Sequence, residues 1–193
     1  MTFEELLNSV LNLFEGGYAF NVLDPGQETY RGIARAIWPK FNGWELVDQI
    51  KRRYPDARDD WDGYMRASEP LQDRVISFYR FDFWDNWRGD EVLEISPAIA
   101  FEVLEGAINQ GLERTAIFLQ TALNTLDRGK AEDLVLDGVV GPKTILRLER
   151  SGDPLVVVKM LECQQGMRYM EIMHRNPRLE IFARSWFRRV RLG

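Results

Sequence analysis

The sequence predicts a mainly α-helical fold, and three observations support this. Apolar residues recur at helical spacing over several long stretches of the chain. Capping residues such as Thr2 and Ser96, or a first-turn proline, stand where these stretches begin. Residues 18–34 are instead rich in Gly, Pro, Asn and Asp, which is typical of a loop or a short β-hairpin. We therefore expect a helical protein interrupted once by a short loop or hairpin.

The first predicted helix begins after Thr2. Thr2 and Glu5 have the spacing of a capping box, in which each side chain bonds the other residue's backbone N–H. Apolar residues then recur on one helical face, at Leu6, Leu7, Val10, Leu11 and Phe14. Gly16 and Gly17 are expected to end this helix through a left-handed conformation. Glu15 would then lie in the last helical turn.

The rest of the first half is expected to alternate helices with connectors. Trp44–Arg53 is a predicted helix, and the acidic stretch Asp56–Asp62 is a predicted loop. Pro70 fits the first turn of a helix whose apolar positions continue to Trp84. Arg88–Asp90 is a plausible junction between two parts of the chain.

The second half is predicted to be helical throughout. One helix opens at Ser96-Pro97 and ends near Gly111, and residues 112–126 form the next. Gly141-Pro142 opens a short helix that runs through Leu148. Residues 154–174 form a long helix, and Pro177 separates it from the last one.

Composition narrows the possible functions. The chain has 193 residues and a net charge of −5, which gives no sign of nucleic-acid binding. The first helix carries Glu4 and Glu5 instead of a basic start, so no signal peptide is predicted, and no apolar run is long enough to cross a bilayer. Cys163 is the only cysteine, which excludes an intramolecular disulfide, and we expect it to be buried. With His174 as the only histidine, no metal site and no cofactor are predicted.

Two carboxyl groups near the first glycines suggest glycosidic-bond chemistry. Glu15 and Asp24 are nine positions apart, and the hydroxyl of Thr29 follows five positions later. Glycoside hydrolysis needs one protonated and one ionised carboxyl group. The negative end of the helix dipole and the neighbouring Phe14 favour a protonated Glu15. From these residues alone, a solvated glutamate at a helix end remains the alternative.

Residues 15–33, which read EGGYAFNVLDPGQETYRGI, resemble the N-terminal signature of the glycoside hydrolase family 108 muramidases. The resemblance implies a lysozyme-like helical catalytic part in which Glu15 is the catalytic glutamate. It also implies that Asp24 and Thr29 position a water molecule. Gln27 departs from the usual second glycine of the pattern, as residues 20–22 also depart from it, and these departures bear on the shape of the loop.

A second resemblance covers the other half. Residues 107–148 contain AINQG, FLQTALN and VLDGVVGPKT, and residues 182–190 read FARSWFRRV. These runs are similar to the peptidoglycan-binding domains that accompany such muramidases. The similarity implies five peptidoglycan-binding residues: Gln120, Asn124, Asp137, Gly138 and Gly141. Turn formation and core packing are the alternative explanation for each of them taken singly. We expect residues 1–88 to form the muramidase catalytic domain and residues 89–193 the helical peptidoglycan-binding domain.

Aromatic residues in the first half are candidates for substrate contact. Sugar-binding clefts use aromatic faces against pyranose rings, and four aromatic residues are candidates here: Tyr18, Trp38, Tyr79 and Trp84. Core packing is the alternative for each ring, because large aromatic side chains are mostly buried.

The two resemblances together imply a glycoside hydrolase of the lysozyme (muramidase) type that cleaves the β-1,4 bond between N-acetylmuramic acid and N-acetylglucosamine. A non-catalytic cell-wall-binding protein and a lytic transglycosylase are the alternatives. The expected partner is peptidoglycan, with no nucleic acid, no stable membrane insertion and a monomeric state. Without a signal peptide, the protein would be made in the cytoplasm. It would reach the periplasm or cell wall after holin-type or dedicated release.

Overall fold

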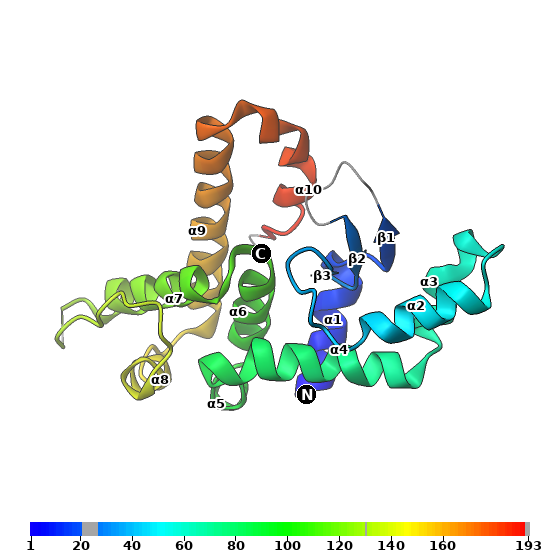
Figure 1. Ribbon diagram of the computed structural model, residues 1–193. Coiled ribbons are helices and arrows are strands. Elements are labelled where there is room, and N and C mark those ends of the chain that lie inside the picture. Colours follow the sequence, from blue (N-terminus) through cyan, green and yellow to red (C-terminus); the bar gives the residue numbers. More distant parts are fainter. Residues whose placement is uncertain (21–26, 130, 192–193) are drawn as a thin grey trace. The chain divides into compact units, whose positions relative to one another are not determined.

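The computed structural model describes residues 1–20, 27–129 and 131–191 (Figure 1). The predicted fold class is confirmed, because the described residues are mainly helical and include one small three-stranded sheet. The chain divides into two compact units, residues 2–82 and residues 83–193. They are called here the N-terminal unit and the C-terminal unit.

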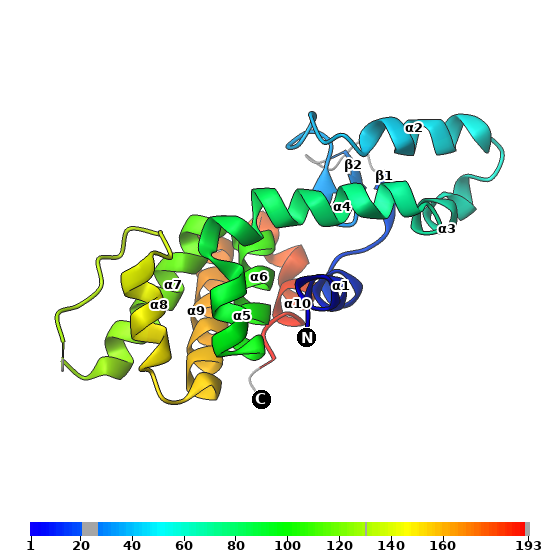
Figure 2. The ribbon, with the colours of Figure 1, turned by 90° about the horizontal axis from the view of Figure 1, so that it is seen from below.

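The N-terminal unit combines helices with the sheet. Its elements are α1 (Phe3–Phe14), β1 (Tyr18–Phe20), β2 (Glu28–Tyr30), β3 (Ile33–Ala34), α2 (Trp44–Arg53), the 3-10 helix η1 (Arg58–Asp60), α3 (Trp61–Arg66) and α4 (Glu69–Asp82). Helix α4 packs against α1, α2 and α3, and α3 also contacts β1. Figure 2 shows α2 and α4 side by side.

The start of α1 is as predicted, but its end is not. Thr2 accepts a hydrogen bond from the Glu5 N–H at 3.2 Å, and the Glu5 side chain accepts one from the Thr2 N–H at 2.8 Å. The expected position of Glu15 in the last turn was wrong, since Glu15 is the C-cap residue with extended backbone (φ −105°, ψ 125°). Gly16 and Gly17 take no left-handed conformation, so the extended Glu15 ends the helix.

The sheet has the order β1-β2-β3, and both pairs are antiparallel. A two-residue turn joins β2 to β3, with Tyr30 opposite Ile33. Both turn residues have positive φ, 46° at Arg31 and 81° at Gly32, which is the pattern of a type I′ hairpin turn. The run of loop-forming residues thus gives the predicted hairpin and one further short strand.

The C-terminal unit is built from helices. Its elements are the 3-10 helix η2 (Trp84–Trp87), α5 (Gly89–Ile95), α6 (Pro97–Gln110), α7 (Leu112–Asp127), α8 (Pro142–Glu149), α9 (Pro154–Arg175), the 3-10 helix η3 (Pro177–Phe182) and α10 (Ala183–Phe187). Helices α6, α7 and α9 pack against one another and form the centre of the unit. Helix α5 covers α6, α8 contacts α5 and α7, and α10 returns to α9.

Local capping explains where the long helices of this unit begin. Ser96 Oγ accepts a hydrogen bond from the Ile99 N–H at 3.3 Å, and Pro97 occupies the first helical turn of α6. Asp153 caps α9 in the same way, accepting from the Leu155 N–H at 3.1 Å before a first-turn proline. These starts agree with the sequence prediction because all their signals are local.

Three other expectations were wrong. Residues 56–62 contain η1 and the beginning of α3 instead of a loop. The helix opened by Pro70 ends at Asp82, so Trp84 lies in the separate element η2. Cys163 is exposed, because the buried face of α9 carries Leu161 and Glu162 instead. None of the described helices combines the length and apolar character that a bilayer-spanning segment needs.

Candidate active site

Glu15 lies where α1 meets the hairpin of the N-terminal unit. Its backbone N–H donates to the Leu11 carbonyl at 3.1 Å, which closes the last turn of α1. The residue is half-buried, so solvent reaches it. Glu15 therefore combines a fixed backbone with a partly accessible side chain, as a proton donor to an external substrate requires.

The β2–β3 turn lies directly against the Glu15 carboxyl group. A Cβ atom added to Gly32 would be 2.9 Å from Glu15 Oε2 and 2.8 Å from the Tyr79 hydroxyl oxygen. Any side chain at position 32 would collide with both groups, and the positive φ of Gly32 adds to the need for glycine. The Tyr79 hydroxyl also donates to the Arg31 carbonyl at 2.7 Å. Tyr79 thus holds the turn that touches Glu15.

The other two predicted catalytic residues differ in what the structure describes. Asp24 lies outside the described residues. Thr29 is the central residue of β2, where it is half-buried and pairs with Ala19 and Ala34. Because side chains alternate along a strand, the Thr29 hydroxyl is on the face of the sheet opposite to Glu28 and Tyr30. The structure therefore brings Thr29 into the same hairpin whose turn contacts Glu15.

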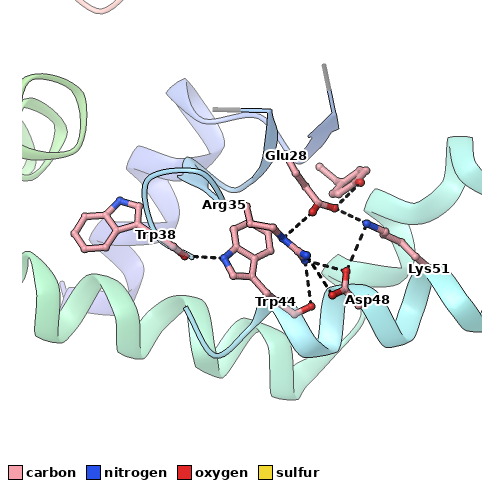
Figure 3. Close-up of polar contacts among 7 residues, drawn as sticks. Glu28, Arg35, Trp38, Trp44, Asp48 and Lys51 are labelled. Atoms are coloured by element: carbon pink, nitrogen blue, oxygen red, sulfur yellow. Dashed lines mark hydrogen bonds and ion pairs between the residues drawn. The ribbon is translucent and has the colours of Figure 1, made fainter. Parts of the chain in front are cut away.

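Glu28 is the centre of a polar cluster (Figure 3). Its Oε1 atom accepts hydrogen bonds from the Tyr18 hydroxyl at 2.7 Å and from Lys51 Nζ at 2.6 Å. Its Oε2 atom forms an ion pair with Arg35 Nε at 2.7 Å. Asp48 bridges the two cations, 2.9 Å from Arg35 Nη2 and 3.5 Å from Lys51 Nζ. The cluster ties β1, β2 and α2 together and engages both oxygens of Glu28.

The cluster shifts the ionisation of its members. Burial raises the pKa of Tyr18, and the hydrogen bond to Glu28 and the negative charge of Glu28 add to the shift. For Asp48, partial burial opposes ionisation, but the hydrogen bond and charge of Arg35 outweigh it and lower the pKa. The raised pKa keeps the Tyr18 hydroxyl protonated near neutral pH, so that it donates its hydrogen bond to Glu28.

A second set of contacts fixes the segment Glu15–Tyr18. The Tyr18 N–H donates to Asp62 Oδ1 of α3 at 2.8 Å, and Arg66 Nε donates to Asp62 Oδ2 at 2.7 Å. A Cβ atom at Gly17 would be 1.9 Å from Asp62 Oδ1, so only glycine admits this approach. The two glycines of the segment were predicted to end a helix. Gly17 instead makes room for the carboxylate that anchors β1.

The four aromatic candidates have different surroundings. Tyr18 and Trp38 are half-buried, and the ring edge of Trp38 meets Phe78 with centroids 5.0 Å apart. Tyr79 is only 1% exposed, and Trp84 is 0% exposed, with its indole N–H donating to Asp90 at 2.9 Å. Both rings are core residues, so the expected substrate contact of Tyr79 and Trp84 does not fit their burial.

The sequence did not single out the partners of Glu28. Lys51 and Asp48 occur at i, i+3 spacing on α2, which is an ordinary surface pair on a helix. Arg35 directly follows β3, and nothing in its sequence context marks it as a partner of Glu28. The cluster depends on how α2 packs beside the sheet, which local patterns do not encode.

The predicted peptidoglycan-binding residues lie on α7 and in the segment that leads to α8 in the C-terminal unit. Gln120 Nε2 donates to Asp137 Oδ1 at 2.7 Å, and the Gly138 N–H donates to Gln120 Oε1 at 3.2 Å. Asn124 exchanges two hydrogen bonds with the backbone of Leu134, at 2.9 and 2.8 Å. Gly141 is the N-cap residue of α8. These side chains attach the segment before α8 to α7.

Comparisons with known families give two matches. A family model described as glycosyl hydrolase 108 matches residues 8–111. A second model, described as a predicted peptidoglycan domain, matches residues 114–191. The two matches meet at the turn between α6 and α7. A search of curated proteins found no match.

Proposed function

Because the chain belongs to the glycosyl hydrolase 108 family, we propose that it cleaves the β-1,4 bond between N-acetylmuramic acid and N-acetylglucosamine, with Glu15 as the general acid. The broader assignment is that of a peptidoglycan hydrolase, since a glycosyl hydrolase part and a peptidoglycan domain follow one another in the chain. The observation that carries the proposal for Glu15 is its contact with Gly32, within the region matched by the hydrolase family.

The proposed reaction starts with proton transfer. The Glu15 carboxyl group donates its proton to the glycosidic oxygen as the bond to the anomeric carbon breaks, so the leaving sugar departs as an alcohol. Water attacks the anomeric carbon and loses a proton to a base. The Gly32 turn supports this role because it restricts the positions that the Glu15 side chain can take.

Asp24 and Thr29 are proposed to act on the water. In this proposal the Asp24 carboxylate accepts the proton of the attacking water, and the Thr29 hydroxyl orients that water. The central place of Thr29 in β2 supports the proposal, because a residue paired on both sides holds its hydroxyl in a fixed position. Direct attack by water inverts the configuration at the anomeric carbon.

Glu28 is a carboxylate of β2, and its surroundings favour a supporting role. Both of its oxygens are engaged, by Lys51 and Tyr18 on one side and by Arg35 on the other. A general acid has to present a proton to the substrate. We therefore assign Glu28 to the positioning of β1 and β2 and assign proton donation to Glu15.

The C-terminal half is proposed to bind the cell wall while the N-terminal half cleaves its glycan strands. The peptidoglycan domain match lies within residues 89–193, the expected binding part. The division near residue 88 stays a prediction. The compact units separate at 82/83, and the family matches separate at 111–114. Action on the wall requires release from the cytoplasm, for which a holin-type route or a dedicated secretion route is proposed.

Mass spectrometry of digested peptidoglycan tests the proposal. Purified sacculi treated with the unmutated protein should yield muropeptides with free reducing ends. Products with a 1,6-anhydro ring would identify a lytic transglycosylase, and the absence of products would identify a non-catalytic binding protein. Glu15→Gln should give no products while retaining the circular dichroism spectrum of the unmutated protein.

A further inference from the structure

The C-terminal unit contains a pocket of about 760 Å³. It lies between the segment that joins α7 to α8 and helix α8 itself, whose positions are seen in Figure 2. Its size is within the range of sites that bind small molecules or short peptides. Gln120, Asp137 and Gly141, three of the predicted peptidoglycan-binding residues, line this pocket.

The wall of the pocket is preformed. Gln120 Nε2 donates to Asp137 Oδ1 at 2.7 Å and to the Val139 carbonyl at 3.0 Å, and Asp137 Oδ1 also accepts from the Val139 N–H at 2.9 Å. These bonds lower the pKa of Asp137, with the Gln120 hydrogen bond as the main cause. A segment fixed in this way loses little conformational freedom when a ligand binds.

Aliphatic groups form part of the lining, and none of the described residues that line the pocket is aromatic. Three of its aliphatic side chains are strongly exposed, Val135 by 75%, Val139 by 59% and Leu146 by 46%. Aliphatic groups exposed together around a pocket indicate a binding surface. Pyranose rings are usually bound against aromatic faces, which this lining does not offer. The pocket therefore suits aliphatic side chains better than it suits sugar rings.

Charges of both signs surround the apolar part. Lys143, Arg147 and Arg150 contribute cations, and Glu132 and Asp133 contribute exposed carboxylates. The Arg147 side chain helps to hold the lining of the pocket together, because its Nη2 atom donates to the Glu132 carbonyl at 2.8 Å. Lys143 and Arg150 are exposed at the rim. A ligand that fits this arrangement carries small apolar groups together with carboxylates and an amine.

We propose that this pocket binds the peptide stem of peptidoglycan and that the C-terminal unit thereby recognises the peptide instead of the glycan. The stem consists of small apolar residues such as alanine, acidic residues and, in many walls, a diamino acid. Its carboxylates pair with Lys143 and Arg150, its amine pairs with the carboxylate of Asp133, and its methyl groups pack on Val135 and Leu146. This inference rests on the proposed function, because it takes peptidoglycan as the ligand.

The first test compares two forms of the wall. The full chain carrying Glu15→Gln is mixed with intact sacculi and, separately, with glycan strands from which an amidase has removed the peptides and which are attached to beads, so that both can be sedimented. Sedimentation of the protein with intact sacculi and its loss from the stripped glycan are expected. Soluble stem peptides should release the bound protein. Equal binding to stripped glycan would overturn the proposal.

The second test uses matched variants in the same Glu15→Gln chain. The double variant Val135→Ala/Leu146→Ala removes exposed apolar groups of the pocket and should weaken binding to sacculi about tenfold. The control Met167→Ala/Ile181→Ala removes groups that are 70% and 80% exposed outside the pocket and should bind like the parent. Lys143→Ala/Arg150→Ala should also weaken binding, and Arg184→Ala should not. Unchanged binding in both pocket variants would overturn the proposal.

The hydrolase assignment is measured separately. The chain with Glu15 intact is assayed for release of reducing ends from soluble, peptide-free glycan strands, where the pocket has no ligand. Release of reducing ends together with unaffected binding in the pocket variants rejects the pocket alone. Failure to release reducing ends from either the strands or intact sacculi rejects the hydrolase proposal instead.

Discussion

Both units bury glutamate side chains, but they neutralise them differently. In the N-terminal unit, Glu28 is 6% exposed and meets two cations, Lys51 at 2.6 Å and Arg35 at 2.7 Å. In the C-terminal unit, three glutamates of α6 and α9 are even more deeply buried: Glu102, Glu105 and Glu162. They share two arginines from the end of the chain, Arg189 and Arg191.

Burial and the neighbouring charges together decide how each group ionises. Burial raises the pKa of Glu102 to about 7, and the negative charges of Glu162 and Glu105 add to the shift, whereas Arg191 opposes it. In the N-terminal unit Asp48, which shares the two cations of Glu28, has a lowered pKa. The cluster of the N-terminal unit thus pairs two carboxylates with two cations, whereas in the C-terminal unit three carboxylates share two cations.

The largest expected effect distinguishes the proposed proton donor, Glu15, from a buried glutamate of the C-terminal unit. Glu15→Gln should lower the turnover of peptide-free glycan by roughly 10²–10⁴-fold or more, since general acid catalysis is lost. Glu102→Gln, the same chemical change in the C-terminal unit, should leave that turnover unchanged. Reducing-end release under substrate saturation measures both. Substantial activity in a folded Glu15→Gln protein would discard Glu15 as the proton donor.

The next effect concerns the stability of the N-terminal unit. Glu28→Ala removes the buried carboxylate of the cluster and leaves Asp48 as the carboxylate beside Arg35 and Lys51, so the loss of these hydrogen bonds should cost about 1–3 kcal/mol. Urea unfolding, followed by tryptophan fluorescence, measures the free energy of unfolding. The control Glu45→Ala removes an exposed carboxylate of α2 and should change it little. A loss below about 1 kcal/mol in Glu28→Ala would mean that solvent screens the cluster.

The features that the sequence could predict are those with local signals. Helix starts at Thr2, Ser96 and Asp153 have their signals within three residues, and the structure has caps at all three positions. The fold class follows from many such local signals. Glu15 could likewise be chosen as a candidate catalytic residue from its neighbours, because the segment that begins at residue 15 has a distinctive order of residues.

What could not be predicted depends on packing. Glu28 meets Lys51 across 23 positions, and Arg191 meets Glu102 across 89, so neither pair has a local signal. Asp62 was predicted to lie in an acidic loop, but it lies in α3 and accepts a hydrogen bond from the Tyr18 N–H. Sequence position placed Tyr79 with the substrate-binding aromatics, whereas the structure buries it under the β2–β3 turn.

A smaller effect is expected in the pH dependence of the C-terminal unit. The pKa of Glu102 rises from its ordinary value of 4.5 to about 7 on folding, so the folded state binds more protons between these values. The free energy of unfolding therefore falls as pH rises through this range, by about 1.4 kcal/mol per pH unit at most. Urea unfolding of the full chain at several pH values measures the slope.

Glu102→Gln provides the matched variant for this slope. The amide keeps the shape of the side chain but takes up no proton, so stability between pH 4.5 and about 7 should depend less on pH. The same slope in the variant would mean that one of the facing groups, Glu105 or Glu162, takes up the proton instead. Glu105→Gln and Glu162→Gln would then identify which of the two takes up the proton.

The smallest expected effect tests how Tyr79 serves Glu15. Tyr79→Phe removes the 2.7 Å hydrogen bond to the Arg31 carbonyl, which should cost about 1 kcal/mol of unfolding free energy. The looser Gly32 turn would let the Glu15 carboxyl group move, so kcat should fall a few-fold while KM stays constant. Tyr64→Phe, which changes a ring that is 38% exposed, should alter neither constant. A rise in KM with unchanged kcat would instead show that Tyr79 contacts the substrate, as its place in the sequence first indicated.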